Sequence, residues 1–386
     1  MNNSPLISIP YVLLVVFLGI LSIVQHQNCQ DRELCHRLKI VGLGIFFIFF
    51  AFRGFIFTDW ITYYPEFEDR SWDDLLNYNV GESREPGFLL LELLCKSIID
   101  NYHFFVFVCT AINVWLLVRF FQQYSTNIFL SLAIYLVFDG FVISINLMRN
   151  AIAICICLNA LPYLFNRKPL EYFGLVLLAI MFHFSAILFL PFYFFLHRKL
   201  NRWVYLGIFI LFNIIFLAQV PILLTLLKLS GFGGDFLADK LEYYTTVSGH
   251  LGIGLGYLER LCFGTLVFCY YNKLMEMRPE NRMFINALIG YFLSTFVLSE
   301  FAEIGSRFRM LFGFAYWILW IELIKCFYYK NNRSLYLLFI SLYCVLKTVT
   351  TINQPIQSYQ NFLLGNVKSY QESKYIFEKT FEEPEY

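Results

Sequence analysis

Charged residues are scarce in this chain, since only 15% of its 386 residues are Asp, Glu, Lys or Arg. A soluble domain carries about 25% charged residues, whereas 59% of this chain is hydrophobic and its mean hydropathy is +0.60. Apolar runs that reach the roughly 20 residues needed to cross a bilayer recur along its whole length. The composition excludes an ordinary soluble protein and predicts an all-α polytopic membrane protein.

Other absences narrow the function further. The net charge is +1, so the chain offers no excess of positive charge for nucleic acid. The start, MNNSPLISIP, has no basic stretch, and no cleavable signal peptide is predicted. The ten cysteines form no CxxC motif and no Cys/His spacing typical of zinc. We therefore predict neither a disulfide framework nor a metal site, and no cofactor.

The apolar runs predict about twelve transmembrane helices. They lie at about 10–25, 39–57, 102–121, 127–146, 149–166, 169–183, 184–197, 203–228, 252–272, 283–301, 308–328 and 334–351. The apolar piece 87–99 is too short to cross and is expected to be a re-entrant or interfacial helix. The run 169–197 is too long for one span, so a bend near His183 should divide it.

Charge in the connecting segments predicts the orientation. Five short turns are basic, which by the positive-inside rule places them in the cytoplasm. The loop 58–86 holds eight acids against two arginines and should face outward, as should the loop 229–251. Both termini then lie on the outer, periplasmic side. We expect a membrane domain over 1–351, whose two outer loops form the catalytic face, and a polar tail over 352–386 that forms a surface helix or is partly disordered.

Ionisable residues gather at the outer ends of the predicted spans. Such groups cost about 2.5–3.5 kcal/mol at the centre of a membrane helix and usually serve a function. Five separate parts of the chain bring them to the same side of the membrane. They are Arg53, Asp59, Glu85, Arg149, His183, Glu300, Glu303, Arg307 and Arg309. Arg149 has only Ser144, Asn146 and Asn150 as polar neighbours in sequence, so its anionic partner must come from elsewhere.

A structural role is the alternative for each of these residues. Arg53 could reach the interface by snorkelling, Arg149 could end a helix, and His183 could be a satisfied core histidine. Arg307 or Arg309 could pair with a nearby glutamate. The carboxylates of the acidic loop could simply be solvated.

If these residues are functional instead, they are expected to bind an anionic lipid headgroup at the outer face. Guanidinium groups bind phosphate oxygens bidentately and keep their charge when partly desolvated. A carboxylate or histidine beside them suits removal of a hydroxyl proton, and long apolar walls suit a polyprenyl tail. No acidic DxD pair has a convincing context, which agrees with a metal-independent site.

Several short motifs occur in a characteristic order. They are FRG (52–54), TDW (58–60), EPGFLLLELLCK (85–96), MRNAIAICICLNALPYLFNRK (148–168), FHFSAILFLPFYF (182–194) and SRFRMLF (306–312). Over residues 40–320 this order resembles the EpsG branch of the Wzy-type polysaccharide polymerases. The resemblance implies a bacterial inner-membrane glycosyltransferase that needs no metal. Such an enzyme moves a growing glycan from undecaprenyl diphosphate onto an incoming lipid-linked repeat unit, for O-antigen, capsule or exopolysaccharide.

The resemblance also implies roles for individual residues. Arg53, Asp59, Glu85, Arg149, His183 and Arg307 match polar positions of the family. Arg53, Arg149, Arg307 and Arg309 are then diphosphate-binding candidates, with Arg53 alternatively holding Asp59. Asp59, Glu85 and His183 are candidates for the catalytic base. Leu311 and Phe312 stand where the family often has tyrosine, so the choice between Arg307 and Arg309 stays open.

The implied partners are the undecaprenyl-diphosphate-linked donor and acceptor glycans and the lipid bilayer, with a chain-length regulator as a further candidate. A ligase that passes the glycan to another acceptor is the alternative within the same class. A transporter or flippase would instead carry charges at the bilayer midplane and show internal repeats. A scaffolding subunit would not need charge on one side.

Overall fold

The computed structural model describes residues 3–79, 84–220, 222, 225 and 252–381, and in these ranges the chain is helical, with one isolated β-bridge and no strand. Seven helical segments are long and apolar enough to cross a membrane. They are Pro5–Gln27, Arg32–Ala51, Tyr102–Tyr124, Ile128–Ile145, Met148–Phe165, Asn281–Glu300 and Lys330–Thr351. The predicted all-α class is confirmed, while the count of about twelve spans and the orientation of the termini stay predictions.

The chain divides into two compact units, which are described separately. The first unit comprises Met1–Pro191 and Ser334–Tyr386, and the second comprises Phe192–Arg333. The tail predicted over 352–386 therefore belongs to the first unit. The outer loop predicted over 229–251 lies outside the described residues.

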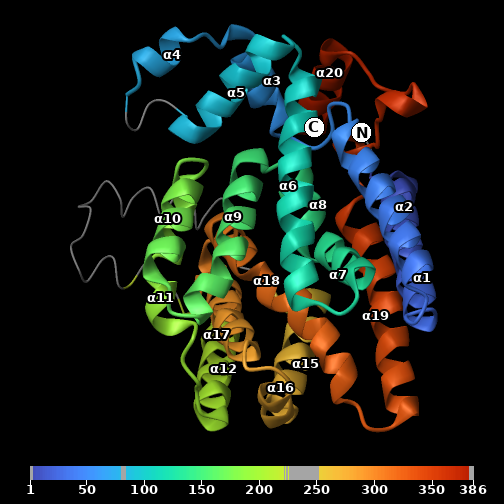
Figure 1. Cartoon of the computed structure of the whole chain (residues 1–386), viewed down its shortest axis with the longest axis vertical. Coiled ribbons are helices and arrows are strands. Elements are labelled where there is room, and N and C mark those ends of the chain that lie inside the picture. Colours follow the sequence, from blue (N-terminus) through green and yellow to red (C-terminus); the bar gives the residue numbers. More distant parts are fainter. Residues whose placement is uncertain (1–2, 80–83, 221, 223–224, 226–251, 382–386) are drawn as a thin grey trace. The chain divides into compact units, whose positions relative to one another are not determined.

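The long helices of the first unit pack in pairs, many of them between helices that are not adjacent in sequence, and Figure 1 shows their arrangement. Its helices are α1 (Ile9–Gln27), α2 (Arg32–Ala51), α3 (Trp60–Asp69), α4 (Asp73–Leu76), α5 (Pro86–Ile98), α6 (Tyr102–Tyr124), α7 (Ile128–Tyr135), α8 (Phe141–Ile145), α9 (Met148–Phe165), α10 (Pro169–Ile180), most of α19 (Lys330–Thr351) and α20 (Tyr370–Phe381). Helix α9 packs against α6 and α10, α2 packs against α6, and α1 packs against α7. Because α9 is apolar on nearly all sides, it is buried along most of its length.

The span predicted over 127–146 is bent in its middle. Helices α7 and α8 are joined by a π-helical turn over Leu136–Gly140, in which Asp139 has a φ of 71°. This left-handed backbone is uncommon for residues other than glycine. A Cβ on the next residue, Gly140, would lie 2.4 Å from the carbonyl oxygen of Tyr135, so only glycine fits the bend.

The predicted short helix at 87–99 and the predicted bend near His183 are both present, and they meet. Helix α10 ends at Ile180, and a 3-10 helix begins at Phe184 after an extended His183. The amide of Gly87, in the first turn of α5, donates to the carbonyl oxygen of Met181 at 2.8 Å. A Cβ on Gly87 would lie 2.9 Å from that oxygen, so glycine permits the close approach.

The C-terminal tail returns to the start of the chain and forms the surface helix that was one of the two predicted outcomes. The amide of Gly54 donates to the carbonyl of Gln360 at 3.1 Å, and the amide of Phe362 donates to that of Phe52 at 2.9 Å. Helix α20 then packs on α3, where the ring centroids of Trp60 and Phe377 are 6.2 Å apart. Figure 1 shows α20 beside α3 and the start of α6.

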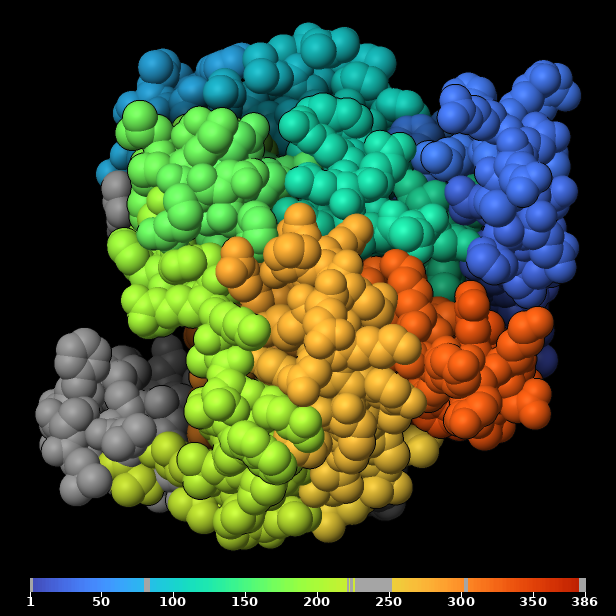
Figure 2. Space-filling model, turned by 60° about the horizontal axis from the view of Figure 1, so that its bottom comes forward, coloured from blue at the N-terminus to red at the C-terminus, as the bar shows by residue number. Residues whose placement is uncertain are grey.

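The second unit is built around a pair of antiparallel helices. It contains α11 (Phe192–Phe195), α12 (Arg202–Leu217), α15 (Leu255–Cys269), α16 (Tyr271–Met277), α17 (Asn281–Phe292) and α18 (Ala302–Cys326). The most extensive helix packing in the unit is between α17 and α18, where the rings of Tyr291 and Tyr316 stack with centroids 4.1 Å apart. Helix α12 packs on α15 and α17, and Figure 2 shows its side chains in yellow-green against the gold ones of the later helices.

Helix α2 ends at Ala51, six residues before the predicted end of its span, and Arg53 explains why. Its Nη1 donates to the carbonyl of Phe50 at 2.7 Å and to Oγ1 of Thr110 at 3.1 Å, and its Nη2 donates to the carbonyl of Ile145 at 3.3 Å. The side chain is only 4% exposed. It satisfies carbonyl groups left open at the ends of α2 and α8, while its backbone pairs with Asn361.

This arrangement predicts that Arg53→Met lowers the free energy of unfolding by about 3 kcal/mol, because three buried acceptors lose a charged donor. The measurement is thermal unfolding of the purified protein in detergent. Arg37→Met is the matched control, since the Arg37 side chain is 73% exposed on the same helix. Unchanged stability in Arg53→Met, together with lost activity, would instead assign Arg53 to ligand binding.

Candidate functional site

Arg149, in the first turn of α9, joins three separate segments of the first unit. Its Nη1 donates to Oε2 of Glu85 at 2.5 Å, and its Nε donates to the hydroxyl of Tyr63 at 3.1 Å. Its guanidinium carbon lies 6.0 Å from the ring centroid of Phe88. The side chains of Arg149 and Glu85 are 17% and 18% exposed, so water screens this ion pair less than it screens a surface pair. The anionic partner expected from elsewhere in the chain is Glu85.

Glu85 is held as an anion by groups on both of its oxygens. Its Oε1 accepts a hydrogen bond from the amide of Phe184 at 3.1 Å, at the start of the 3-10 helix. Partial burial by itself raises the pKa of Glu85, but the charge of Arg149 and the backbone hydrogen bonds outweigh it, and the pKa is lowered overall. In this state Glu85 orients Arg149 and is a weak base.

His183 lies at the edge of the same network. Its Nδ1 shares a hydrogen bond of 2.7 Å with Oγ of Ser185, which in turn donates to Oδ1 of Asn150 at 3.0 Å. Asn150 directly follows Arg149 in α9. The imidazole is therefore fixed relative to the residue that binds Glu85.

Asp59 is placed by the turn that leads into α9. The side-chain oxygen of Asn146 accepts from the backbone amides of Thr58 at 3.0 Å and Asp59 at 2.8 Å. Asp59 precedes Tyr63 by four residues and therefore faces the same side of α3. Burial raises the pKa of Tyr63, so its hydroxyl accepts the Arg149 hydrogen bond as a neutral phenol.

Arg84 is a second arginine of this site, which the sequence analysis did not single out. Its guanidinium carbon lies 5.6 Å from the ring centroid of Tyr63, and that of Arg149 lies 5.8 Å from the same centroid. Arg84 also makes a bidentate pair with Glu66, with Nε to Oε2 at 2.8 Å and Nη2 to Oε1 at 2.5 Å. Two guanidinium groups thus share one aromatic ring. One sequence signal could have pointed to Arg84, because loop 58–86 holds only two arginines beside its eight acidic residues.

The other arginine of that loop, Arg70, binds a buried carboxylate on α5. Its Nε donates to Oε2 of Glu92 at 3.0 Å, and it lies 3.6 Å from Glu66 and 3.8 Å from Asp74. Burial raises the pKa of Glu92 to about 7, although Arg70 acts in the opposite direction. An adjoining cavity of about 380 Å³ is lined by Glu66, Arg70, Asp73, Asp74, Asn77, Arg84 and Leu89. Glu66 is one of the loop carboxylates that could have been solvated, and Glu92 was not singled out from the sequence, because the depth of burial depends on how α3, α4 and α5 pack.

The predicted site residues therefore fall into three groups. Glu85, Arg149 and His183 belong to one network, and Asp59 is tied to it through Asn146. Arg53 lies in the same unit, and its side chain donates hydrogen bonds to two carbonyl groups and to Thr110. Arg307 and Arg309 stand on the first turns of α18 in the second unit, where Arg307 is exposed and Arg309 is partly exposed. The catalytic and diphosphate-binding roles of all of these residues stay predictions.

The second unit has a buried polar group of its own that the sequence analysis missed. Glu259 and Arg260 are neighbours on α15, and they interact electrostatically with Tyr316 and Tyr291. Glu259 is only 4% exposed. Through the described ranges of the chain, no three His, Cys, Asp or Glu side chains gather closely enough to hold a metal ion. Metal independence stays a prediction.

Comparison with known proteins gives one match. Residues 38–363 match the EpsG family. This range contains Arg53, Asp59, Glu85, Arg149 and His183, together with Arg307 and Arg309. No curated protein and no solved structure matches the chain.

The raised pKa of Glu92 predicts a pH dependence of stability. Its pKa is about 7 in the folded protein against an ordinary 4.5, so stability falls as the pH rises from about 4.5 through 7 and then levels off. The difference corresponds to ~3 kcal/mol. Unfolding temperatures of wild type should therefore fall between pH 5 and pH 8, and Glu92→Gln should remove most of that fall. Glu378→Gln on α20, where the side chain is 54% exposed, is the control. An equal pH dependence in Glu92→Gln and wild type would contradict the assignment.

Proposed function

The chain belongs to the EpsG family, a family of membrane proteins similar to polysaccharide polymerases, and on that premise we propose that it is a glycosyltransferase of the bacterial inner membrane. It polymerises oligosaccharide repeat units linked to undecaprenyl diphosphate, on the periplasmic face, into a surface polysaccharide such as O-antigen, capsule or exopolysaccharide. The seven apolar helices support a multi-pass membrane protein.

The observation that carries this proposal is the setting of Arg149. Its guanidinium group is partly shielded from water, is aligned by Glu85 and Tyr63, and shares the Tyr63 ring with Arg84. Two arginines around one ring suit a ligand with two adjacent negative groups, because each guanidinium can bind phosphate oxygens in a fork. A diphosphate is such a ligand.

The reaction balances with the chain's own groups. A hydroxyl oxygen of the acceptor saccharide forms a bond with the anomeric carbon of the donor glycan. The bond between that carbon and the donor's diphosphate oxygen breaks, and undecaprenyl diphosphate leaves with the electron pair. The proton of the acceptor hydroxyl passes to a base. Arg149 and Arg84 offset the charge that develops on the leaving diphosphate, a kind of stabilisation whose removal typically costs 10²–10³ in rate.

Glu85 becomes a better base when the diphosphate binds. The pKa of Glu85 is lowered by the charge of Arg149, and a phosphate that takes over Arg149 removes that effect. Partial burial, which raises the pKa, is then less strongly opposed, so the freed carboxylate becomes a better proton acceptor. His183 and Asp59 are the alternative bases, held beside the same network through Ser185 and Asn146.

The remaining arginines take supporting roles in this proposal. Arg307 and Arg309, which stand on α18, stay candidates for diphosphate binding in their own right. Arg53, whose hydrogen bonds close the ends of α2 and α8, acts by holding the first unit together. A ligase or a transporter of lipid-linked sugars would use the same diphosphate site, so product analysis separates these functions.

The proposal predicts that purified protein, given a lipid-diphosphate-linked repeat unit without added metal, forms a ladder that lengthens one repeat at a time. Arg149→Gln should slow ladder formation by at least 100-fold, and Arg149→Lys should restore only part of the rate because it lacks the fork. The matched control is Arg119→Gln, because Arg119 is exposed and lies near the C-terminal end of α6. The products are resolved on a gel, and unfolding temperatures confirm that the variants are folded.

Three outcomes distinguish the alternatives. A ladder that survives in Arg149→Gln would contradict the diphosphate site. Transfer of a single unit to an added acceptor, without a ladder, would support a ligase. Movement of the lipid-linked sugar across a vesicle membrane without any new bond would support a transporter.

A further inference from the structure

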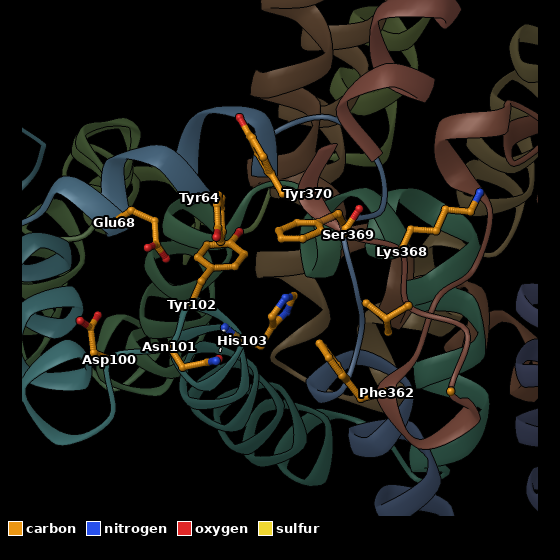
Figure 3. Close-up of a pocket in the computed structure, with 13 residues that line it drawn as sticks. Tyr64, Glu68, Asp100, Asn101, Tyr102, His103, Phe362, Lys368, Ser369 and Tyr370 are labelled. Carbon is orange, nitrogen blue, oxygen red and sulfur yellow. Dashed lines mark hydrogen bonds between the residues drawn. The ribbon is translucent and has the colours of Figure 1, made fainter. Parts of the chain in front are cut away.

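An aromatic cavity borders α3, the helix whose Tyr63 accepts a hydrogen bond from Arg149. Its volume is about 500 Å³, within the range of small-molecule sites. Its walls come from Phe55, from α3, from the start of α6, and from the tail over 362–370, as Figure 3 shows. All of these segments belong to the first unit.

The cavity is bordered by an ordered group of rings. Tyr64 of α3 and Tyr370 of the tail stack with ring centroids 4.7 Å apart, and Tyr102 meets Tyr64 edge to face at 5.4 Å. His103 and Phe362 form a second edge-to-face pair, with centroids 4.5 Å apart. Such rings offer flat apolar surfaces, and the tyrosines add hydroxyl groups at their tips.

The polar groups around the cavity are mainly acceptors of hydrogen bonds. Glu68 and Asp100 line it and are exposed, and Asp100 is 3.7 Å from Lys96, whose side chain is 18% exposed. Lys368 is the basic residue among the lining residues. Two carboxylates against one ammonium group disfavour a phosphate or another anion. Flat apolar surfaces bordered by carboxylates suit a ligand with an apolar face and many hydroxyl groups, and a neutral saccharide has this character.

Helix α3 connects this cavity to the proposed diphosphate site. Tyr63 accepts from Arg149, and the next residue, Tyr64, lines the cavity. Consecutive residues of a helix point in directions about 100° apart, so α3 presents one tyrosine to each site. A saccharide whose diphosphate lies at Arg149 can therefore extend over α3 into the cavity.

The tail wall is firmly held, and part of it lies beyond the residues that match the family. Gln360 fixes it from two sides, since its Nε2 donates to the carbonyl of Phe55 at 3.1 Å and its Oε1 accepts from the amide of Lys368 at 3.0 Å. The family match ends at residue 363, whereas Lys368 and Tyr370 lie beyond it. A wall outside the shared part of the chain is suited to distinguish one glycan from another.

We propose that the juxtaposition of Tyr64, Tyr102, Glu68 and Asp100 with Tyr370 of the tail forms a binding site for the neutral saccharide of the lipid-linked repeat unit. The tail helps to set which saccharide is accepted. The inference rests on the proposed function for the identity of the ligand, but saccharide binding can be measured without any reaction.

The test applies the purified full-length protein in detergent to an array of neutral and acidic oligosaccharides and titrates the saccharides that bind. Neutral saccharides should bind, and Tyr370→Ala should raise their Kd at least tenfold. Tyr370→Phe should bind like wild type because it keeps the ring. Tyr375→Ala is the matched control, since Tyr375 is on the same helix, is 54% exposed and is not a lining residue. The affinity of Tyr370→Ala for farnesyl diphosphate should be unchanged, which also shows that this variant is folded.

The inference is overturned if no saccharide of the array binds, or if Tyr370→Ala and Tyr375→Ala have the same Kd. Its failure is distinguishable from failure of the proposed function. Saccharide binding that depends on Tyr370, without a product ladder, supports the cavity and contradicts the polymerase. A ladder whose rate and donor KM are unchanged in Tyr370→Ala supports the polymerase and contradicts the cavity.

Discussion

The ion pair between Arg149 and Glu85 is the interaction on which the first unit's polar end depends. A charged group that is shielded from water needs a partner of opposite charge, and loss of one partner of a buried pair costs several kcal/mol. Here the partners come from the start of α9 and the residue before α5. Tyr63 brings α3 to the same guanidinium group, and Phe184 brings the bend after α10 to the same carboxylate. One pair therefore fixes the mutual positions of four segments that are far apart in sequence.

The same arrangement accounts for the proposed chemistry. An arginine that is already aligned by a carboxylate needs little rearrangement to bind a phosphate, because the oxygen geometry of the two groups is similar. The exchange also changes the carboxylate, since Glu85 keeps its low pKa only while Arg149 is its partner. Binding of the leaving group and activation of the base are then two results of one change of partner. Arg84 and the Arg70–Glu92 pair extend the charged surface along α3 and α5.

The sequence predicted most of the helices and singled out residues that the structure brings together around Arg149, and its errors have identifiable causes. Long apolar runs revealed α1, α6 and α9, and their charged ends pointed to Arg149 and Glu85. The end of α2 was placed six residues too late, because it depends on hydrogen bonds between residues 52–54 and the tail about 300 residues away. That same contact holds Arg53 against carbonyl groups. Glu92 and Arg84 were missed because neither burial nor a shared aromatic ring has a signature within a short segment of sequence.

The most direct test of the central claim is the affinity for a lipid diphosphate when Glu85 no longer competes for Arg149. Titration calorimetry in detergent would compare farnesyl diphosphate binding to wild type, Glu85→Gln and the exposed control Glu378→Gln. The account predicts binding to Glu85→Gln that is about tenfold tighter than to wild type, equivalent to ~1.4 kcal/mol, and no change in the control. Unchanged or weaker binding to a folded Glu85→Gln variant would contradict the exchange of partners at Arg149.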